Sequence, residues 1–202
     1  ALDADVQSNT LLHDALTRTD SAAQPVRAID VFNTCSWNRT DIVKVPQEWT
    51  VTGDVVKDES GGSVPSQRLS TGELAFLATD VAALGAKRFT VHPGKPGAPA
   101  SAALKSVAAV DGHTLSAGAL KVTIEPGTGA IAALMWNDHN FVKNGAQNEP
   151  LLNDYFYVAG RKPTDPQRNG PASIQVRETG PLVASVVITS TAPGCNTLER
   201  EL

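Results

Sequence analysis

The residue types that bind metals are present in this sequence, but their spacing does not define a site. The histidines are His13, His92, His113 and His139, and no two of them stand three or four residues apart. No His-Glu-x-x-His, Cys-x-x-Cys or His-x-Asp pattern occurs, so the ligand spacing of zinc sites is missing. His139 belongs to a polar run after an apolar one, which is typical of a surface turn. We therefore predict no metal site in this chain.

Catalytic residues for covalent or hydrolytic chemistry are equally hard to find. No Gly-x-Ser-x-Gly motif occurs, and no cysteine lies near a histidine in the sequence. Hydrolysis of a glycosidic bond needs a pair of carboxyl groups. Glu149, Asp154 and Asp165 are candidates by residue type alone, and any protein surface carries such residues. We predict no catalytic residue here.

Aromatic residues offer one candidate binding feature, the run Tyr155-Phe156-Tyr157. In a strand, Tyr155 and Tyr157 share one face and Phe156 takes the other. One interpretation places Phe156 in the core and the tyrosines on a partly wet surface. The other has a tyrosine hydroxyl meeting a ligand or a neighbouring domain, as buried tyrosines need a polar partner.

Charge and cysteine content limit the classes of function. The net charge is −4 and the basic residues form only isolated pairs, Lys87-Arg88 and Arg161-Lys162, which disfavours nucleic-acid binding. No apolar stretch approaches the length that crosses a bilayer, so we predict no membrane partner. Cys35 and Cys195 could form one bridge or remain two free thiols, and we favour free thiols. The compartment stays undetermined.

The hydrophobic pattern predicts a mainly β protein. From Ala28 onward apolar and polar residues alternate with period two, which indicates strands with one buried face. The expected strands cover residues 29–31, 49–52, 74–79, 89–91, 120–124, 131–136, 155–158, 173–177 and 182–190. Turns are expected at 57–63, at Asp111-Gly112 as a tight hairpin, and at 125–128 as a type II turn with Pro126 and Gly127 at its centre.

Two segments lie outside this β pattern. Residues 1–19 carry apolar residues loosely on one helical face, which predicts a short helix that ends before Pro25. Residues 93–100 are rich in proline and glycine, which predicts a linker between two domains. The final run, Thr-Leu-Glu-Arg-Glu-Leu, alternates without a turn signal, and we interpret it as a strand that the chain end interrupts.

Several stretches resemble one protein family. Residues 31–46, VFNTCSWNRTDIVKVP, resemble the Phe-Asn-x-x-Ser-Trp-x-Arg opening of the β region that follows the catalytic domain in family 38 α-mannosidases. Further segments are similar to later strands and turns of that region, in the same order: 64–67, 74–91, 115–138, 176–188 and 197–202. The resemblance covers residues 28–202.

The resemblance implies a fold and a division of the chain. It implies a small antiparallel β-sandwich at 27–93, a linker at 94–106, and the first part of a galactose-mutarotase-like β supersandwich at 107–202, truncated at its C-terminal end. Residues 1–26 would be a helical or linker segment. The chain would be a non-catalytic fragment of an enzyme that hydrolyses α-D-mannosidic bonds in oligosaccharides with retention.

The resemblance also implies partners and one site residue. The family's aspartate nucleophile, its acid/base and its zinc, held by His and Asp residues, belong to an N-terminal catalytic domain, so none is expected here. In some members a tyrosine of a Tyr-x-Phe strand reaches the sugar, which makes Tyr155 the candidate substrate-binding residue, although Tyr157 replaces the phenylalanine. The expected partners are the catalytic domain and a mannose-containing carbohydrate. A carbohydrate-binding module and a structural or oligomer-forming β domain are the alternatives.

Overall fold

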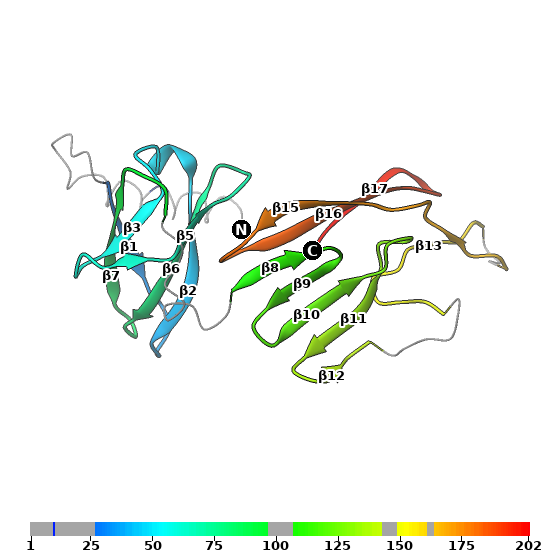
Figure 1. The fold of residues 1–202 in the computed structure, drawn as a ribbon, viewed down its shortest axis with the longest axis horizontal. Helices are drawn as coiled ribbons and strands as arrows, with labels where there is room; N and C mark the ends of the chain where they lie inside the picture. The colour runs from blue at the N-terminus through cyan, green and yellow to red at the C-terminus, as the bar shows by residue number, and fades with distance from the viewer. Residues whose placement is uncertain (1–9, 11–26, 97–106, 143–148, 161–163) are drawn as a thin grey trace.

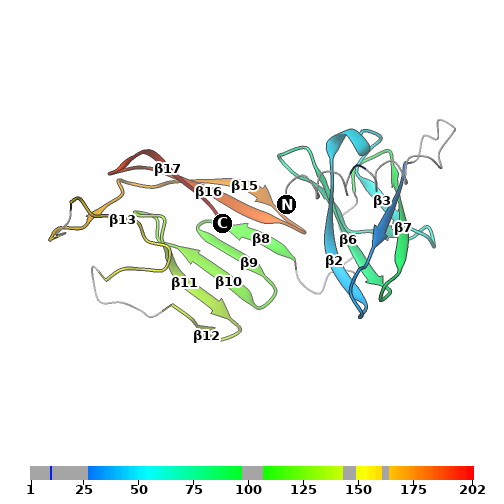
Figure 2. The same cartoon turned by 180° about the vertical axis from the view of Figure 1, so that it is seen from behind.

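The computed structural model describes residues 10, 27–96, 107–142, 149–160 and 164–202. It shows a mainly β protein, as predicted, with two groups of antiparallel sheets lying side by side (Figures 1 and 2). We call residues 27–96 the N-terminal sandwich and residues 107–202 the C-terminal sheets. The predicted N-terminal helix and most of the predicted linker lie outside the described residues, and the predicted domain boundaries stay predictions.

The N-terminal sandwich consists of two sheets that face each other (Figure 1). One sheet has the order β1-β7-β3-β4 and the other the order β2-β6-β5. Their bounds are β1 Arg27–Phe32, β2 Arg39–Val45, β3 Val55–Asp58, β4 Ser63–Val64, β5 Ser66–Arg68, β6 Leu74–Val81 and β7 Ala86–His92. The rings of Phe76 and Phe89, 4.9 Å apart, join the two sheets at the centre of the core.

The C-terminal sheets are a five-stranded sheet of order β12-β11-β10-β9-β8, a three-stranded sheet β15-β16-β17 and the short pair β13-β14. Their bounds are β8 Ala108–Asp111, β9 Thr114–Ala117, β10 Leu120–Ile124, β11 Ile131–Trp136, β12 His139–Asn140, β13 Phe156–Tyr157, β14 Gln167–Arg168, β15 Ser173–Thr179, β16 Ala184–Ala192 and β17 Cys195–Glu201. A core of Leu115, Ile124, Val186 and Ile188 lies between the two larger sheets.

The predicted turn at Asp111-Gly112 is a hairpin, with Asp111 paired to Thr114 and Gly112 at a φ of 55°. Glycine suits this place because positive φ strains other residues. The type II turn predicted at 125–128 is wrong. The Glu125 carboxylate accepts hydrogen bonds from the backbone N–H groups of Gly127 and Thr128, and the positive φ of 72° falls on Gly129 instead of Gly127.

The strand predicted at 49–52 is also wrong. Pro46 follows the last residue of β2, and residues Gln47–Trp49 form a short 3-10 helix, η1. Thr50 is fully buried at its end, with the hydroxyl 3.3 Å from the carbonyl oxygens of Pro46 and Gln47. These local hydrogen bonds compete with strand pairing, as threonine side chains often do near turns.

Strand β6 departs from simple alternation because both of its faces are covered. Leu74, Phe76 and Ala78 point into the sandwich core, as predicted. Ala75 is nevertheless fully buried as well, because it packs with Leu69 of the sandwich and Leu182 of the C-terminal sheets. The contact between the two β regions therefore includes a small apolar cluster of its own.

Candidate functional site

Tyr155, the candidate substrate-binding residue, lies immediately before the short strand β13. Its hydroxyl donates a hydrogen bond to the carbonyl oxygen of Pro193, 2.5 Å away, and lies 4.0 Å from the sulfur of Cys195. Desolvation, together with the neighbouring Cys195 thiol, raises the pKa of Tyr155. The phenol therefore stays protonated at neutral pH and acts as a donor to the turn between β16 and β17.

Tyr157 contacts the same turn. Tyr155 itself lies outside the strand, so the placement of both tyrosines on one strand face stays a prediction. A Cβ added to Gly194 would lie 2.3 Å from the Tyr157 ring. Phe156 is only half-buried, and the Arg168 guanidinium lies 4.9 Å from its ring centre. The interpretation of Phe156 as a core residue is wrong, because strand β13 pairs with β14 at the margin of the C-terminal sheets and not beneath them.

The three candidate carboxylates are not arranged as a catalytic pair. Asp154 has a side chain that is 1% exposed, forms an ion pair of 3.4 Å with Arg168 and accepts a hydrogen bond from the Tyr155 N–H. Asp165 and Glu149 are exposed loop residues. The Asp154 carboxylate thus holds the start of β13 in place.

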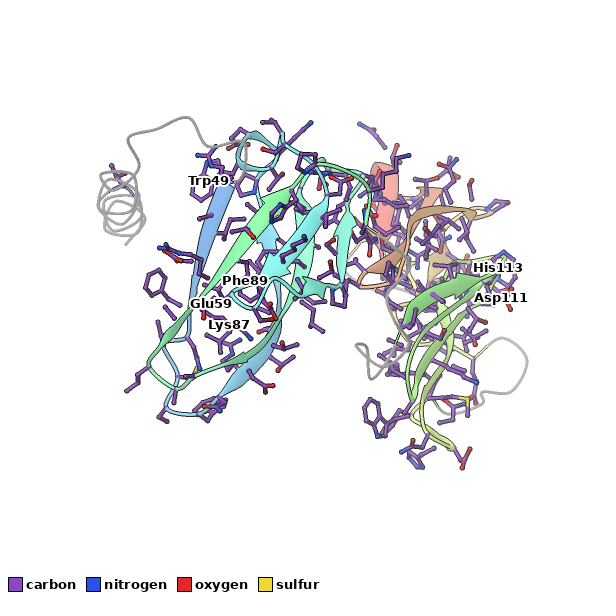
Figure 3. The ribbon with its side chains drawn as sticks, turned by 60° about the vertical axis from the view of Figure 1, so that its left-hand side comes forward. Trp49, Glu59, Lys87, Phe89, Asp111 and His113 are labelled. Carbon is purple, nitrogen blue, oxygen red and sulfur yellow. The ribbon has the colours of Figure 1, made fainter. Side chains whose placement is uncertain are left out.

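The described histidines are scattered. His92 bonds to Thr90 at 2.9 Å, and the His139 ring packs edge-on against Phe141 with the centroids 4.6 Å apart. Figure 3 shows His113 with Asp111 at the end of the β8–β9 hairpin, away from the labelled residues of the N-terminal sandwich. Among the described residues, no group of three or more His, Cys, Asp or Glu side chains could hold a metal ion. His13 lies outside them.

The N-terminal sandwich has a depression of about 470 Å³ on its surface. Arg68 lies in it, but all three of its guanidinium nitrogens already donate to this chain. Their acceptors are the Asp54 carboxylate, the Thr50 hydroxyl, and the carbonyl oxygens of Thr50, Gly53 and Gly72. The guanidinium therefore ties the segment after η1 to β5, which is a structural task.

Sequence reasoning missed a second polar cluster, beneath the turn that Glu125 caps. Arg200 of β17 donates to the carbonyl oxygens of Thr128 and Asn153, and Asn169 donates to Thr128 at 3.0 Å and to Gly170 at 2.8 Å. Burial lowers the pKa of Arg200, although the charge of Asp154 works in the opposite direction. Its partners are far apart in the sequence, so no local pattern signals this cluster.

The five-stranded sheet has one face that is covered only in part. Leu115 and Ile124 pack under the sheet β15-β16-β17, which contacts β8 and β9 (Figure 1). Trp136 lies on the same face, since it pairs directly with Leu120, two residues along β10 from Val122. Its side chain is 55% exposed. We call the part of this face that β11 and β12 form the uncovered face.

Both cysteines are free, as favoured from the sequence. Cys35 is half-buried in the loop after β1, and Cys195 is exposed at the start of β17. One thiol therefore lies in each β region. In the described part of the chain, the structure contains no helix long and apolar enough to cross a membrane.

Comparison with known proteins gives a likeness of fold. No family model matches the chain, and no curated protein matches it in sequence. The fold is similar to part of a solved structure, a protein in the glycosyl hydrolase family 38 from Enterococcus faecalis, with a TM-score of 0.52 and 17% sequence identity. The match covers 83% of this chain and 24% of that one, so this chain spans about a quarter of its length.

Proposed function

We propose that this chain is a non-catalytic β portion of a family 38 glycoside hydrolase, a retaining α-mannosidase that cleaves α-D-mannosidic bonds in oligosaccharides. Its β regions pack against a catalytic domain and complete part of the wall of the active-site cleft. The order of the family-like segments along the sequence and the likeness of fold to part of a family 38 protein both support the proposal.

The observation that carries the proposal is the uncovered face of the five-stranded sheet. A sheet buries one face against another layer, and here the same face buries Leu115 at one end and exposes Trp136 at the other. Phe141, just after β12, is 62% exposed beside it. Exposed aromatic side chains beside a buried sheet face support the proposal of a contact with further polypeptide. A chain that supports a larger enzyme has such a face, and the proposal assigns it to a further layer of the same enzyme.

The proposal assigns the reaction itself to the partner domain. That domain would supply the aspartate nucleophile, the acid/base and the zinc ion. From this chain, Tyr155 is the residue we assign to the sugar. Because its hydroxyl already donates to Pro193, it would meet a sugar hydroxyl as a hydrogen-bond acceptor.

Two experiments test whether the partner domain carries the reaction and this chain supports it. The chain alone, supplied with zinc and an aryl α-mannoside, is expected to show no turnover above background, and turnover would contradict the proposal. The residues encoded ahead of Ala1 should form a large domain with a His-x-Asp pair. Joining that domain to this chain should then raise its mannosidase activity, whereas equal activity with and without this chain would count against a supporting role.

A carbohydrate-binding module is the second candidate, because exposed rings can stack on sugars. Trp136 is exposed, and the His139 and Phe141 rings lie on the same hairpin. This candidate predicts heat of binding with mannose or mannan that Trp136→Ala abolishes. A flat titration at millimolar sugar dismisses it.

A further inference from the structure

The side chain of Gln67 makes several hydrogen bonds between the two β regions. Gln67 of β5 is buried, and its carbonyl oxygen accepts hydrogen bonds from the N–H groups of Leu182 and Val183, at 3.0 and 2.9 Å. Its amide nitrogen donates to the Val183 carbonyl at 3.0 Å and to the Glu178 carboxylate at 3.3 Å. The full hydrogen-bonding capacity of the amide is therefore used between the regions.

Glu178 reaches this contact because of a bulge in β15. The register shifts between Val176 and Glu178, so that Glu178 lies opposite Ser185 instead of Ala184. A slip of one residue moves a side chain to the other face of a sheet. Glu178 is 8% exposed, and its carboxylate accepts hydrogen bonds from Gln67 and, at 2.6 Å, from the backbone N–H of Ser70.

The burial of Gln67 and Glu178 at this place costs free energy, so stability alone does not explain the pair. It lies beside the apolar cluster of Leu69, Ala75 and Leu182, which Leu77 and Val183 extend. No ion pair to Glu178 is formed among the described residues. Replacement of buried charged groups by apolar side chains of equal volume is often neutral or stabilising. A polar pair does, however, restrict the contact to one geometry, since any other leaves its groups unsatisfied.

We propose that Gln67 and Glu178 form an orientation latch, which fixes the N-terminal sandwich in one position relative to the C-terminal sheets. The latch holds the two regions in a single arrangement. It concerns the chain itself and does not depend on the proposed mannosidase role.

The native cysteines allow a direct test in the whole chain, because Cys35 and Cys195 report from different regions. Both thiols receive spin labels, and double electron–electron resonance gives the distribution of distances between them. The unmodified chain is expected to give one narrow peak. The double variant Q67M/E178M, which replaces the pair with apolar side chains of similar length, should keep a cooperative thermal transition and give a broad or bimodal distribution.

The matched control is Q175M/E199M, which makes the same two replacements at exposed positions of the sheet β15-β16-β17. It should leave the peak narrow. If the double variant fails to fold, Glu178→Gln serves in its place. The two Glu178 oxygens accept from Ser70 and Gln67, so the NH₂ group of the new glutamine must face one of these donors and leave it unsatisfied. A peak that stays narrow in the folded Q67M/E178M or E178Q chain, or one that is already broad in the unmodified chain, overturns the latch.

Discussion

The hydroxyl of Tyr155 donates to the carbonyl oxygen of Pro193, a residue 38 positions later in the chain. This bond joins the start of β13 to the turn between β16 and β17. The tyrosine therefore has a structural partner in the protein itself, beside any partner in a substrate.

Tyr155→Phe is expected to lower the free energy of unfolding, because it removes the hydrogen bond to the Pro193 carbonyl oxygen. Urea denaturation followed by circular dichroism measures this loss. Tyr157→Phe is the control, because its ring remains against Gly194. Equal stability of the Tyr155→Phe and unmodified chains would show that the bond is not formed in solution.

Gly194→Ala should destabilise the same turn through two separate effects. Gly194 has a φ of 82°, which costs other residues about 1–2 kcal/mol. The added Cβ would also meet the Tyr157 ring at 2.3 Å, which adds about 1–3 kcal/mol of overpacking.

Gly61→Ala separates these effects, because Gly61 has a φ of 81° and no atom lies within 4 Å of the place that an added Cβ would take. Thermal unfolding of the two variants should differ by the overpacking alone. Equal losses of stability would mean that Tyr157 does not press on this turn.

The lowered pKa of Glu125 should make the free energy of unfolding depend on pH in the acid range. Burial works to raise its pKa, but the hydrogen bonds from Gly127 and Thr128, with the charge of Arg168, lower the pKa below its ordinary value. In the unfolded chain the pKa returns to about 4.3. The contribution of Glu125 is therefore complete above that pH and is lost as the pH falls through the lower, folded-state value.

Glu125→Gln removes this titration. Urea midpoints measured from pH 6 down to pH 3 should fall less steeply for the variant than for the unmodified chain. Parallel curves would show that the carboxylate does not cap the turn.

Because the face is covered only in part, truncation of its side chains to alanine should lower the free energy of unfolding by unequal amounts along the sheet. Leu115→Ala should cost about 2–5 kcal/mol, because Leu115 is buried under β16. Trp136→Ala on the same face should cost about 1 kcal/mol or less in the isolated chain, since its side chain is mostly exposed. Chemical denaturation compares the two. A large loss at Trp136 would show that this end of the sheet is covered within the chain.

The strands were predictable where one face meets a core and the other meets water. Strand β10 follows its alternation of Leu120, Val122 and Ile124. Gly112 marked the hairpin between β8 and β9, because few residues accept that turn. Strand β6 showed the limit of the pattern, since the burial of Ala75 comes from a segment more than a hundred residues later.

The contacts of the candidate site and of the Gln67–Glu178 pair depended on long-range geometry that the sequence does not display. A bulge directs Glu178 to Gln67, and nothing in the local run of residues signals it. The pairing of β13 with β14 leaves Phe156 half-buried, and the run Tyr155-Phe156-Tyr157 does not reveal which strand will be its neighbour. The run also does not reveal that Tyr155 lies outside the strand, since only Phe156 and Tyr157 pair with β14.

The connection between β6 and β7 affects how the N-terminal sandwich folds. The two strands are joined by a short turn and yet belong to opposite sheets, so they do not form a hairpin. Strand β7 pairs instead with β1 and β3, with Arg27 opposite Val91 at the far end. The sandwich must therefore close long loops before its central strand gains partners, which places its folding among the slow β topologies, on the order of milliseconds to seconds.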